Sequence, residues 1–213
     1  MANLDKNATL ELIELHKISA IIRTGHRDLA RDAVGAAVSG GFRIVEFTLT
    51  TPGALELIAE FARDDRLLVG AGTVLTTQST RDAVHAGARY VVSPVTNPEV
   101  IRAAMEAGAV CIPGTFTPNE MVAAHEAGAD FVKLFPAPAD VADYVAAILG
   151  PLPFLKIFPT AGVTAENLAK VLAAGAAGAG FVRSLFDPDD LAEKNFAAIE
   201  RRAADIVHRL SSR

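Results

Sequence analysis

The stretch EAGADFVKLFP, residues 126–136, joins the end of a helical pattern to a short apolar run through a single glycine, Gly128. Glycine is the natural residue to end a helix, because it adopts the left-handed backbone conformation without a steric penalty. The same phrase recurs as SGGFRIVEF (39–47), HAGARYVVSP (85–94), EAGAVCIPG (106–114) and AAGAAGAGFV (173–182). The chain is therefore predicted to repeat one unit of helix, glycine and strand.

The spacing of the central glycines sets the number of units. Gly41, Gly87, Gly108, Gly128 and Gly175 are separated by 46, 21, 20 and 47 residues, so each long gap has room for one more unit. LLVGAGTV (67–74) lies in the first long gap and LKIFPTAGV (155–163) in the second. Eight strands are therefore expected, near residues 18–23, 43–49, 67–74, 90–94, 110–115, 131–136, 155–161 and 177–182.

This repeat predicts an α/β fold, a single (β/α)8 or TIM barrel. The strands are mostly apolar without alternation, which suits a parallel sheet covered on its outer face. A helix over 7–16, capped by Asn7 or Thr9, would close the barrel floor or pack on its side. The alternative is an open doubly wound sheet, but no GxGxxG follows the first strand. A length of 213 residues without a Pro/Gly/Ser-rich linker indicates one domain, 1–213.

Several classes of function do not fit the composition. The net charge is −5 and the basic residues are scattered, so neither nucleic acid nor an anionic membrane is an expected partner. No cationic segment followed by an apolar run opens the chain, and no long apolar stretch interrupts it, which predicts a cytoplasmic protein. The lone cysteine, Cys111, is expected in the core. The five histidines stand apart, so we expect no metal site and no cofactor.

Polar residues stand at the carboxyl ends of the predicted strands, where barrels of this type carry their chemistry. The residues read at these strand ends, in chain order, are Arg23, Glu46, Thr48, Thr50, Thr73, Pro94, Thr115, Lys133, Thr160, Gly162 and Arg183. This set is rich in polar groups for so apolar a chain.

Lys133 lies in FVKLFP, between large apolar residues. Burial disfavours the ammonium and lowers the pKa of a lysine, and a neutral amine can attack a ketone to give an iminium. The iminium withdraws electrons, so that a neighbouring C–C bond can break or form. The alternative is a structural lysine whose stem lines the apolar wall while its ammonium reaches a carboxylate.

Glu46, in IVEFTL, is an equally unexpected charge in the second strand. Two buried groups of opposite charge near strand ends form either an internal ion pair or an acid/base couple, and we favour the couple. In a retro-aldol reaction the carboxylate would move protons to and from the carbinolamine, the substrate hydroxyl and the enamine carbon.

Two glycine-containing motifs complete the candidate site. VGAGTV supplies small residues that would let a ligand approach the backbone, with the Thr73 hydroxyl beside it. In PTAGV, Thr160 and the amides of Ala161, Gly162 and Val163 face the predicted barrel mouth ahead of a helix, an arrangement that binds anions. Each motif alone could simply form a turn.

Together these motifs resemble the 2-keto-3-deoxy-6-phosphogluconate and 4-hydroxy-2-oxoglutarate aldolase family over essentially the whole chain. The resemblance rests on VEFTL, VGAGTV, VVSP, IPGTFTPNE, DFVKLFPA and FPTAGVTAENL in this order. It implies a Schiff base on Lys133 and general acid/base action by Glu46. It further implies that Thr73 holds the pyruvyl group and that Pro94 shapes its pocket. A homotrimer and the absence of a metal are also implied.

The carboxylate-binding residue needs a separate assignment. Many members carry an arginine at the position of Thr50, whereas others combine threonine there with an arginine at the end of strand one. AIIRT matches the second pattern, so carboxylate binding is assigned to Arg23, with Thr50 beside the substrate.

The clearest departure from the family lies at strand eight. A Gly-Gly-Ser or Gly-x-Gly-Ser turn usually grips a phosphate there, whereas AGAGFVRSLF places Phe181, Val182 and Arg183 at those positions. Ala161 likewise replaces a usual glycine. A bulky Phe or Val should close part of the amide nest. Arg183 could bind the phosphate instead, recognise a carboxylate, or simply be a surface residue.

The function expected from these residues is that of a lyase, a class I aldolase. It would cleave a 2-keto-3-deoxy sugar acid, with or without a 6-phosphate, or 4-hydroxy-2-oxoglutarate, to pyruvate and an aldehyde. One alternative is a sugar-phosphate isomerase or epimerase that uses Lys133 and Glu46 for proton transfer. A non-catalytic ligand-binding barrel is another, although such a protein would be expected to lack the lysine or the carboxylate.

Overall fold

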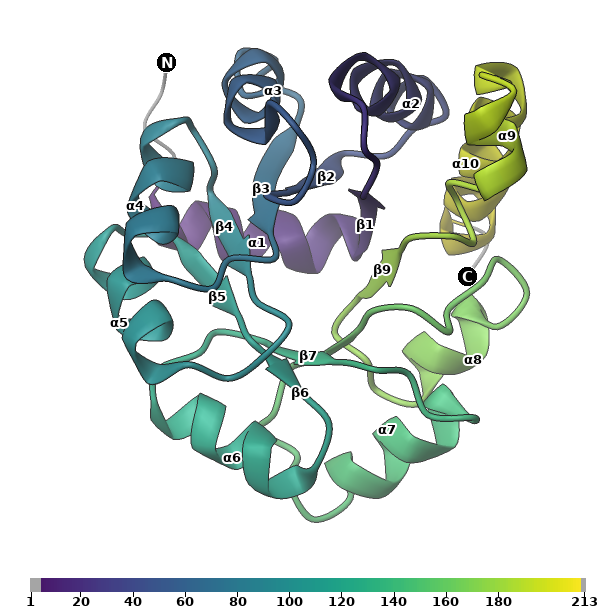
Figure 1. The fold of residues 1–213 in the computed structure, drawn as a ribbon. Coiled ribbons are helices and arrows are strands. Elements are labelled where there is room, and N and C mark those ends of the chain that lie inside the picture. The colour runs from purple at the N-terminus through teal and green to yellow at the C-terminus, as the bar shows by residue number, and fades with distance from the viewer. Residues whose placement is uncertain (1–4, 212–213) are drawn as a thin grey trace.

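The computed structural model describes residues 5–211 and shows parallel strands surrounded by helices (Figure 1). The strands are β1 Ile18–Ile22, β2 Ile44–Thr48, β3 Leu68–Gly72, β4 Tyr90–Val92, β5 Val110–Ile112, β6 Gly114–Thr115, β7 Val132–Leu134, β8 Ile157–Pro159 and β9 Ala179–Phe181. The helices are α1 Lys6–His16, α2 Arg27–Ser39, α3 Ala54–Phe61, α4 Thr77–His85, α5 Pro98–Glu106, α6 Pro118–Glu126, α7 Val141–Leu149, α8 Leu168–Ala173, α9 Pro188–Ala192 and α10 Phe196–Ser211.

The strands close into the predicted barrel. One parallel sheet has the order β5-β4-β3-β2-β1-β9 and the other β6-β7-β8. Strands β5 and β6 are one predicted strand that is interrupted at Pro113, which has no N–H to donate to a neighbour. A parallel bridge between Thr160 and Gly180 joins the other edges of the two sheets. Eight βα units therefore surround one axis, as the glycine spacing predicted.

The five repeat glycines end their helices in the expected way. Their φ angles are positive, between 71° and 112°, a region in which residues with a side chain are strained. The chain then enters the next strand within a few residues. The helix–glycine–strand phrase therefore has a direct conformational cause.

Alternate strand residues face two different cores. Outward-facing side chains such as Val45, Phe47 and Cys111 pack under the alanine-rich helices, and the expected burial of Cys111 is confirmed. Inward-facing apolar side chains fill the lower part of the barrel as a separate cluster. Its buried members are Ile13, Ile44, Leu68, Tyr90, Val92, Val110, Ile112, Phe131 and Phe158. Both strand faces are apolar, which explains the unalternating sequence.

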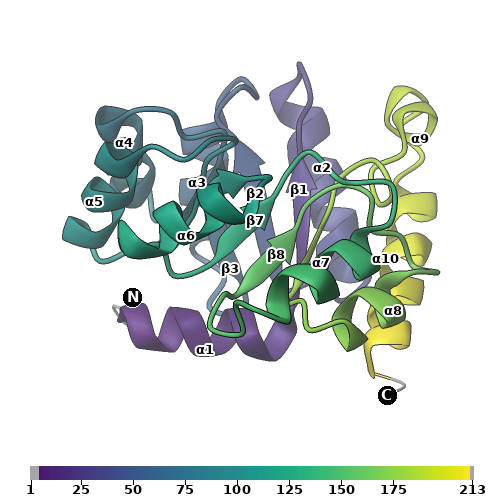
Figure 2. The same ribbon diagram turned by 90° about the horizontal axis from the view of Figure 1, so that it is seen from below.

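Helix α1 closes the floor of the barrel, where it lies across the lower end of the strands (Figure 2). Its residue Ile13 is 1% exposed and packs among the first residues of several strands. The expected cap at Asn7 or Thr9 is wrong, because Asp5 Oδ1 accepts the Ala8 amide at 2.8 Å. The Thr9 hydroxyl instead donates to the Asp5 carbonyl at 3.2 Å. None of the helices within residues 5–211 is long and apolar enough to cross a membrane.

Candidate active site

A cavity of about 340 Å³ opens at the carboxyl ends of the strands. Seven of the ten predicted site residues line it, from five different parts of the chain. They are Arg23, Glu46, Lys133, Thr160, Ala161, Gly162 and Arg183. The barrel therefore gathers residues separated by up to 160 positions in the sequence around one space.

Lys133 reaches this cavity from the middle of β7 and is 6% exposed. Burial lowers the pKa of its amine; the Glu46 carboxylate opposes this effect, and the Arg23 guanidinium adds to it. The Nζ atom lies 4.7 Å from the centre of the Phe135 ring, which offers its π face to the amine. Burial and Arg23 therefore make this amine easier to deprotonate than that of an exposed lysine.

Glu46 reaches the same cavity from β2 and is 3% exposed. Burial raises the pKa of its carboxyl from 4.5 to about 7, against the opposing effects of Lys133 and Arg23. Although both groups line the cavity, Glu46 and Lys133 interact through space without a direct ion pair. A carboxyl group with this pKa can give or take a proton near neutral pH.

The two arginines lie at the cavity rim and are exposed. Arg23 Nη2 donates to the Thr73 hydroxyl at 3.3 Å, so Thr73 orients the guanidinium although it does not itself line the cavity. Arg183 forms no ion pair with any residue in the described part of the chain. Both guanidinium groups are therefore available to an anionic ligand.

Thr50 and Pro94 do not line the cavity. The Thr50 hydroxyl is 3.1 Å from the Thr48 hydroxyl, and Thr50 lies in a separate surface hollow with Ser79 and Asp82. The backbone of Pro94 packs against Gly114, where a β-carbon would overlap the Pro94 carbonyl. The sequence could not separate Thr50 and Pro94 from Arg23, Thr160 and Arg183, which do line the cavity, because all five follow strand ends.

The residues at which strand eight departs from the family pattern lie in different surroundings. Val182 lines the cavity as expected, but Phe181 points outward, is fully buried and packs edge-on against Phe42 with ring centres 6.0 Å apart. The Ser184 hydroxyl donates to the Val163 carbonyl at 2.7 Å. Of the two bulky residues, only Val182 therefore contributes to the cavity wall.

The loop after β8 holds two successive left-handed residues, Ala161 at φ 70° and Gly162 at φ 69°. The first angle strains a residue that carries a side chain, so position 161 favours glycine. The Thr164 amide donates to Asn167 Oδ1 at 2.8 Å, and α8 begins only at Leu168. The amides of the predicted anion site, those of Ala161, Gly162 and Val163, therefore lie in a loop several residues before α8 rather than in its first turn.

Four further lining residues were missed: Ile21, Phe135, Thr164 and Ser184. Ile21 precedes Arg23 by two positions and Phe135 follows Lys133 by two, so strand periodicity places each on the same inward face as its partner. That signal was available. Thr164 and Ser184 lie in loops, where no periodicity applies.

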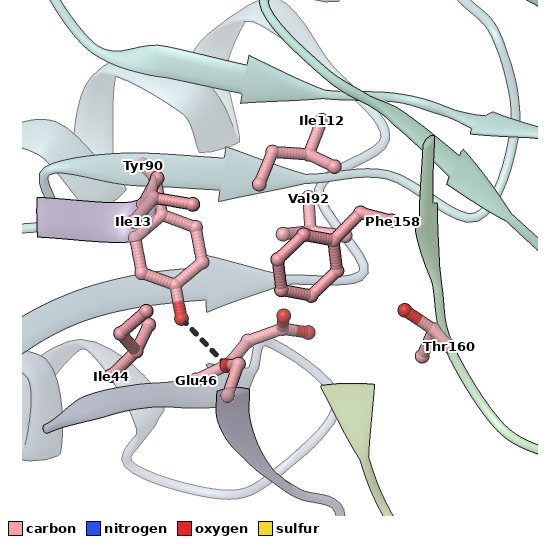
Figure 3. Close-up of a pocket in the computed structure, with 9 residues that line it drawn as sticks. Ile13, Ile44, Glu46, Tyr90, Val92, Ile112, Phe158 and Thr160 are labelled. Atoms are coloured by element: carbon pink, nitrogen blue, oxygen red, sulfur yellow. Dashed lines mark hydrogen bonds between the residues drawn. The ribbon is translucent and has the colours of Figure 1, made fainter. Parts of the chain in front are cut away.

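A small, largely apolar chamber lies beneath the cavity, and Glu46 and Thr160 form part of the wall of both (Figure 3). At its far side the Tyr90 hydroxyl donates to the Val45 carbonyl at 3.0 Å and lies 3.2 Å from the Ser19 hydroxyl. Glu46 thus has apolar protein below it and the open cavity above it.

The glycines of VGAGTV have a different role from the one expected. A β-carbon at Gly70 would overlap the Tyr90 ring, and one at Gly72 would overlap the Glu46 carboxylate. The protein's own side chains, rather than a ligand, occupy the space that these glycines leave. No cluster of three or more His, Cys, Asp or Glu residues suited to a metal ion occurs between residues 5 and 211.

Comparison with known proteins agrees with this geometry. The family model described as "Aldolase: KDPG and KHG aldolase" matches residues 10–202. The chain belongs to this aldolase family. It is therefore a lyase, and the family match favours the aldolase over the isomerase and binding-protein alternatives.

Individual relatives support the same assignment. The 2-dehydro-3-deoxy-6-phosphogalactonate aldolase of Escherichia coli K12 is 38% identical over 170 residues, 78% of this chain and 83% of its own. A solved structure titled "Native KDPGal structure" has a TM-score of 0.81 at 34% identity, covering 91% of this chain and 93% of its own. The KDPG aldolase of Legionella pneumophila, solved with pyruvate as a covalent carbinolamine, has a TM-score of 0.78 at 25% identity, covering 94% and 97%.

Proposed function

We propose that Lys133 forms the Schiff base of this aldolase and that Glu46 transfers its protons. The reaction class follows from the family: the chain is a class I pyruvate aldolase of 2-keto-3-deoxy sugar acids. The observation that carries the residue assignment is that two nearly fully buried groups of opposite charge, from β7 and β2, share one cavity. The pyruvate carbinolamine of the Legionella relative supports an amine nucleophile in this family.

The geometry suggests how cleavage proceeds. The neutral amine of Lys133 adds to the substrate C2 carbonyl, and the carbinolamine loses water to give an iminium. Glu46 takes the proton of the C4 hydroxyl, the C3–C4 bond breaks, and its electron pair moves to the iminium to form an enamine. The aldehyde then leaves. Glu46 returns a proton to C3, and water releases pyruvate from the lysine.

We further propose that Arg23 binds the substrate carboxylate and Arg183 the anionic group at the other end of the substrate. A 6-phosphorylated 2-keto-3-deoxy sugar acid is anionic at both ends, and the relative from E. coli is named for such a substrate. Both arginines line the cavity, and neither forms an ion pair with a carboxylate between residues 5 and 211. A bidentate guanidinium contact can replace amide groups in holding a phosphate. Thr160, Ala161 and Gly162 would enclose the part of the substrate between them.

The lysine assignment is tested by borohydride reduction with pyruvate, followed by peptide mass spectrometry. We expect a reduced pyruvate adduct at Lys133 and no adduct in Lys133→Met. Lys156, 47% exposed and paired with Glu14 at 2.6 Å, is an internal control that should stay unmodified. An unmodified Lys133 in active enzyme would contradict the proposal.

The arginine assignment is tested by turnover of phosphorylated and unphosphorylated substrates, and of 4-hydroxy-2-oxoglutarate, by wild type and Arg183→Ala. Loss of a charge-assisted hydrogen bond costs about 1.5–3 kcal/mol, so KM for the phosphorylated substrate should rise about 10- to 100-fold with little change in kcat. Equal effects on phosphorylated and unphosphorylated substrates would contradict phosphate binding by Arg183. A selective effect on 4-hydroxy-2-oxoglutarate would indicate a carboxylate instead.

We also propose that the chain acts as a homotrimer in the cytoplasm. Exposed apolar side chains stand at the carboxyl ends of neighbouring units, including Leu75 at 49%, Val95 at 52% and Phe116 at 37%. Exposed apolar side chains that form a contiguous patch commonly mark subunit contacts. Sedimentation should give a trimer for wild type and a smaller species for Leu75→Asp/Val95→Asp. A monomeric wild type would contradict the oligomer.

A further inference from the structure

We propose that Gly72, the last residue of β3, is a positioning residue for Glu46. The space left by its missing side chain holds the carboxylate where it can exchange protons with substrate on Lys133. This inference rests on the proposed function of Glu46. It gives the second glycine of VGAGTV a role in the reaction rather than in a turn.

The contact is direct. A β-carbon at Gly72 would overlap Oε1 of Glu46 and lie 2.8 Å from Cδ and 3.1 Å from Cγ. Distances this short are not tolerated between real side chains. An alanine at this position therefore requires the Glu46 carboxylate to move.

Packing sets the position of this carboxylate. No group in residues 5–211 donates a hydrogen bond to Glu46, in contrast to Asp5, Asp130 and Glu120, which accept backbone amides at 2.8–2.9 Å. A carboxylate without fixed donors is oriented by the walls around it. The empty position at Gly72 is therefore a main determinant of where its oxygens lie.

The backbone at Gly72 does not itself require glycine. Its φ lies outside the left-handed region, its carbonyl accepts the Leu49 amide at 2.8 Å, and it pairs in register with Thr48. Alanine can adopt this conformation. A substitution here should leave the strand intact and act on the neighbouring side chain.

The neighbouring glycine, Gly70, has the opposite properties. Its β-carbon would overlap the Tyr90 ring, which is 2% exposed and held by its hydroxyl to the Val45 carbonyl. That ring has no room to move, so an alanine at position 70 would damage the fold. Glu46 can instead turn upward into the cavity, because the chamber below it is largely apolar (Figure 3).

Displacement of the carboxylate should have two measurable effects. A misplacement of about 1 Å costs on the order of 100-fold in rate, within the 100- to 10,000-fold contribution of general acid/base catalysis. A carboxylate that moves toward the open cavity is also better solvated, which lowers its pKa. The limb of the pH–rate profile near 7 should then move to lower pH.

The experiment compares Gly72→Ala in wild type and in Glu46→Ala by single-turnover cleavage of a 2-keto-3-deoxy-6-phospho sugar acid. We expect Gly72→Ala to lower the rate about 100-fold in wild type and less than threefold in Glu46→Ala, since its effect passes through Glu46. The limb of the pH–rate profile near 7 should move in Gly72→Ala alone, and not in the double variant, which lacks the Glu46 carboxylate. Gly35→Ala, on α2 with open space around it, is the matched control and should match wild type.

Two results would overturn the inference: a Gly72→Ala rate within threefold of wild type, or an equal loss in both backgrounds. If Gly72→Ala does not fold, thermal unfolding of the double variant decides, because removal of the Glu46 side chain should restore stability; an equally unstable double variant also overturns it. Unchanged turnover in Glu46→Ala would instead refute the role of Glu46 in the proposed function. Thermal unfolding of Gly72→Ala and of the double variant would still test the contact between position 72 and Glu46.

Discussion

The burial of Glu46 predicts that this carboxylate destabilises the fold as the pH rises. Its pKa is raised from 4.5 to about 7, mainly because the ionised form loses water on burial. A tenfold change in proton affinity is worth about 1.4 kcal/mol, so the folded state loses about 3 kcal/mol relative to the unfolded chain when both are ionised. Glu46→Gln keeps the shape of the side chain but cannot ionise.

The sign follows from proton binding. Below about pH 4.5 both the folded and the unfolded state hold the proton, and ionisation of Glu46 costs the fold nothing. Between about 4.5 and 7 the unfolded chain releases its proton first, so the free energy of unfolding falls with rising pH. Above about 7 the full loss remains. The free energy of unfolding of Glu46→Gln, relative to that of wild type, should therefore rise by about 3 kcal/mol between pH 4.5 and 8.

Urea denaturation of both proteins at several pH values, at one protein concentration, measures this difference. Glu120→Gln is a control for which the difference in stability from wild type should change with pH in the opposite direction. Backbone amides of Thr117 and Phe116 hold the pKa of Glu120 below its ordinary value, so its contribution is present at neutral pH and lost on acidification. A difference between wild type and Glu46→Gln that stays constant from pH 4.5 to 8, or that shrinks, would refute the reasoning.

Three further changes test the fold in urea denaturation or thermal unfolding. Ile13→Ala should cost about 3 kcal/mol, because it removes a 1% exposed side chain from the closed floor; a loss below 1 kcal/mol would contradict its role as a plug. Arg202→Ala should cost about 2 kcal/mol by removing bonds of 2.6 Å to Asp190 and 2.7 Å to the Leu185 carbonyl, and Arg202→Lys should recover only part of it. Ala161→Gly should add about 1 kcal/mol by relieving a left-handed alanine, and a loss of stability would refute that strain.

The sequence carried the fold because the repeated unit is local. A glycine that ends a helix and the apolar run that follows it can be recognised from residues close together in the sequence. Every predicted strand overlaps an observed one. The errors are also local: Asp5 caps α1 although two other candidates follow it, and Pro113 divides one predicted strand into two. Such details depend on single hydrogen bonds rather than on the repeat.

The site could be predicted only in part, because its geometry depends on contacts between strands. Lys133 and Glu46 stood out as charges in apolar runs, and the barrel brings both into the cavity that opens at the carboxyl ends of the strands. Nothing local distinguishes Thr50, which faces another hollow, from Thr160, which lines the cavity. The role proposed for Gly72 could not be predicted either, because it depends on which side chain of a neighbouring strand packs against it.

The same arrangement links substrate binding to the charge of the nucleophile. Burial lowers the pKa of Lys133, Glu46 opposes this effect, and Arg23 at the rim adds to it, so Arg23 disfavours a positive charge on the amine. In the proposed assignment a substrate carboxylate neutralises Arg23 as it binds, and the repulsion that disfavours a positive charge on Lys133 is removed. The iminium, which is permanently cationic, then forms beside a compensated arginine and an ionisable Glu46. Binding of the carboxylate thus prepares the electrostatic surroundings that the covalent intermediate needs.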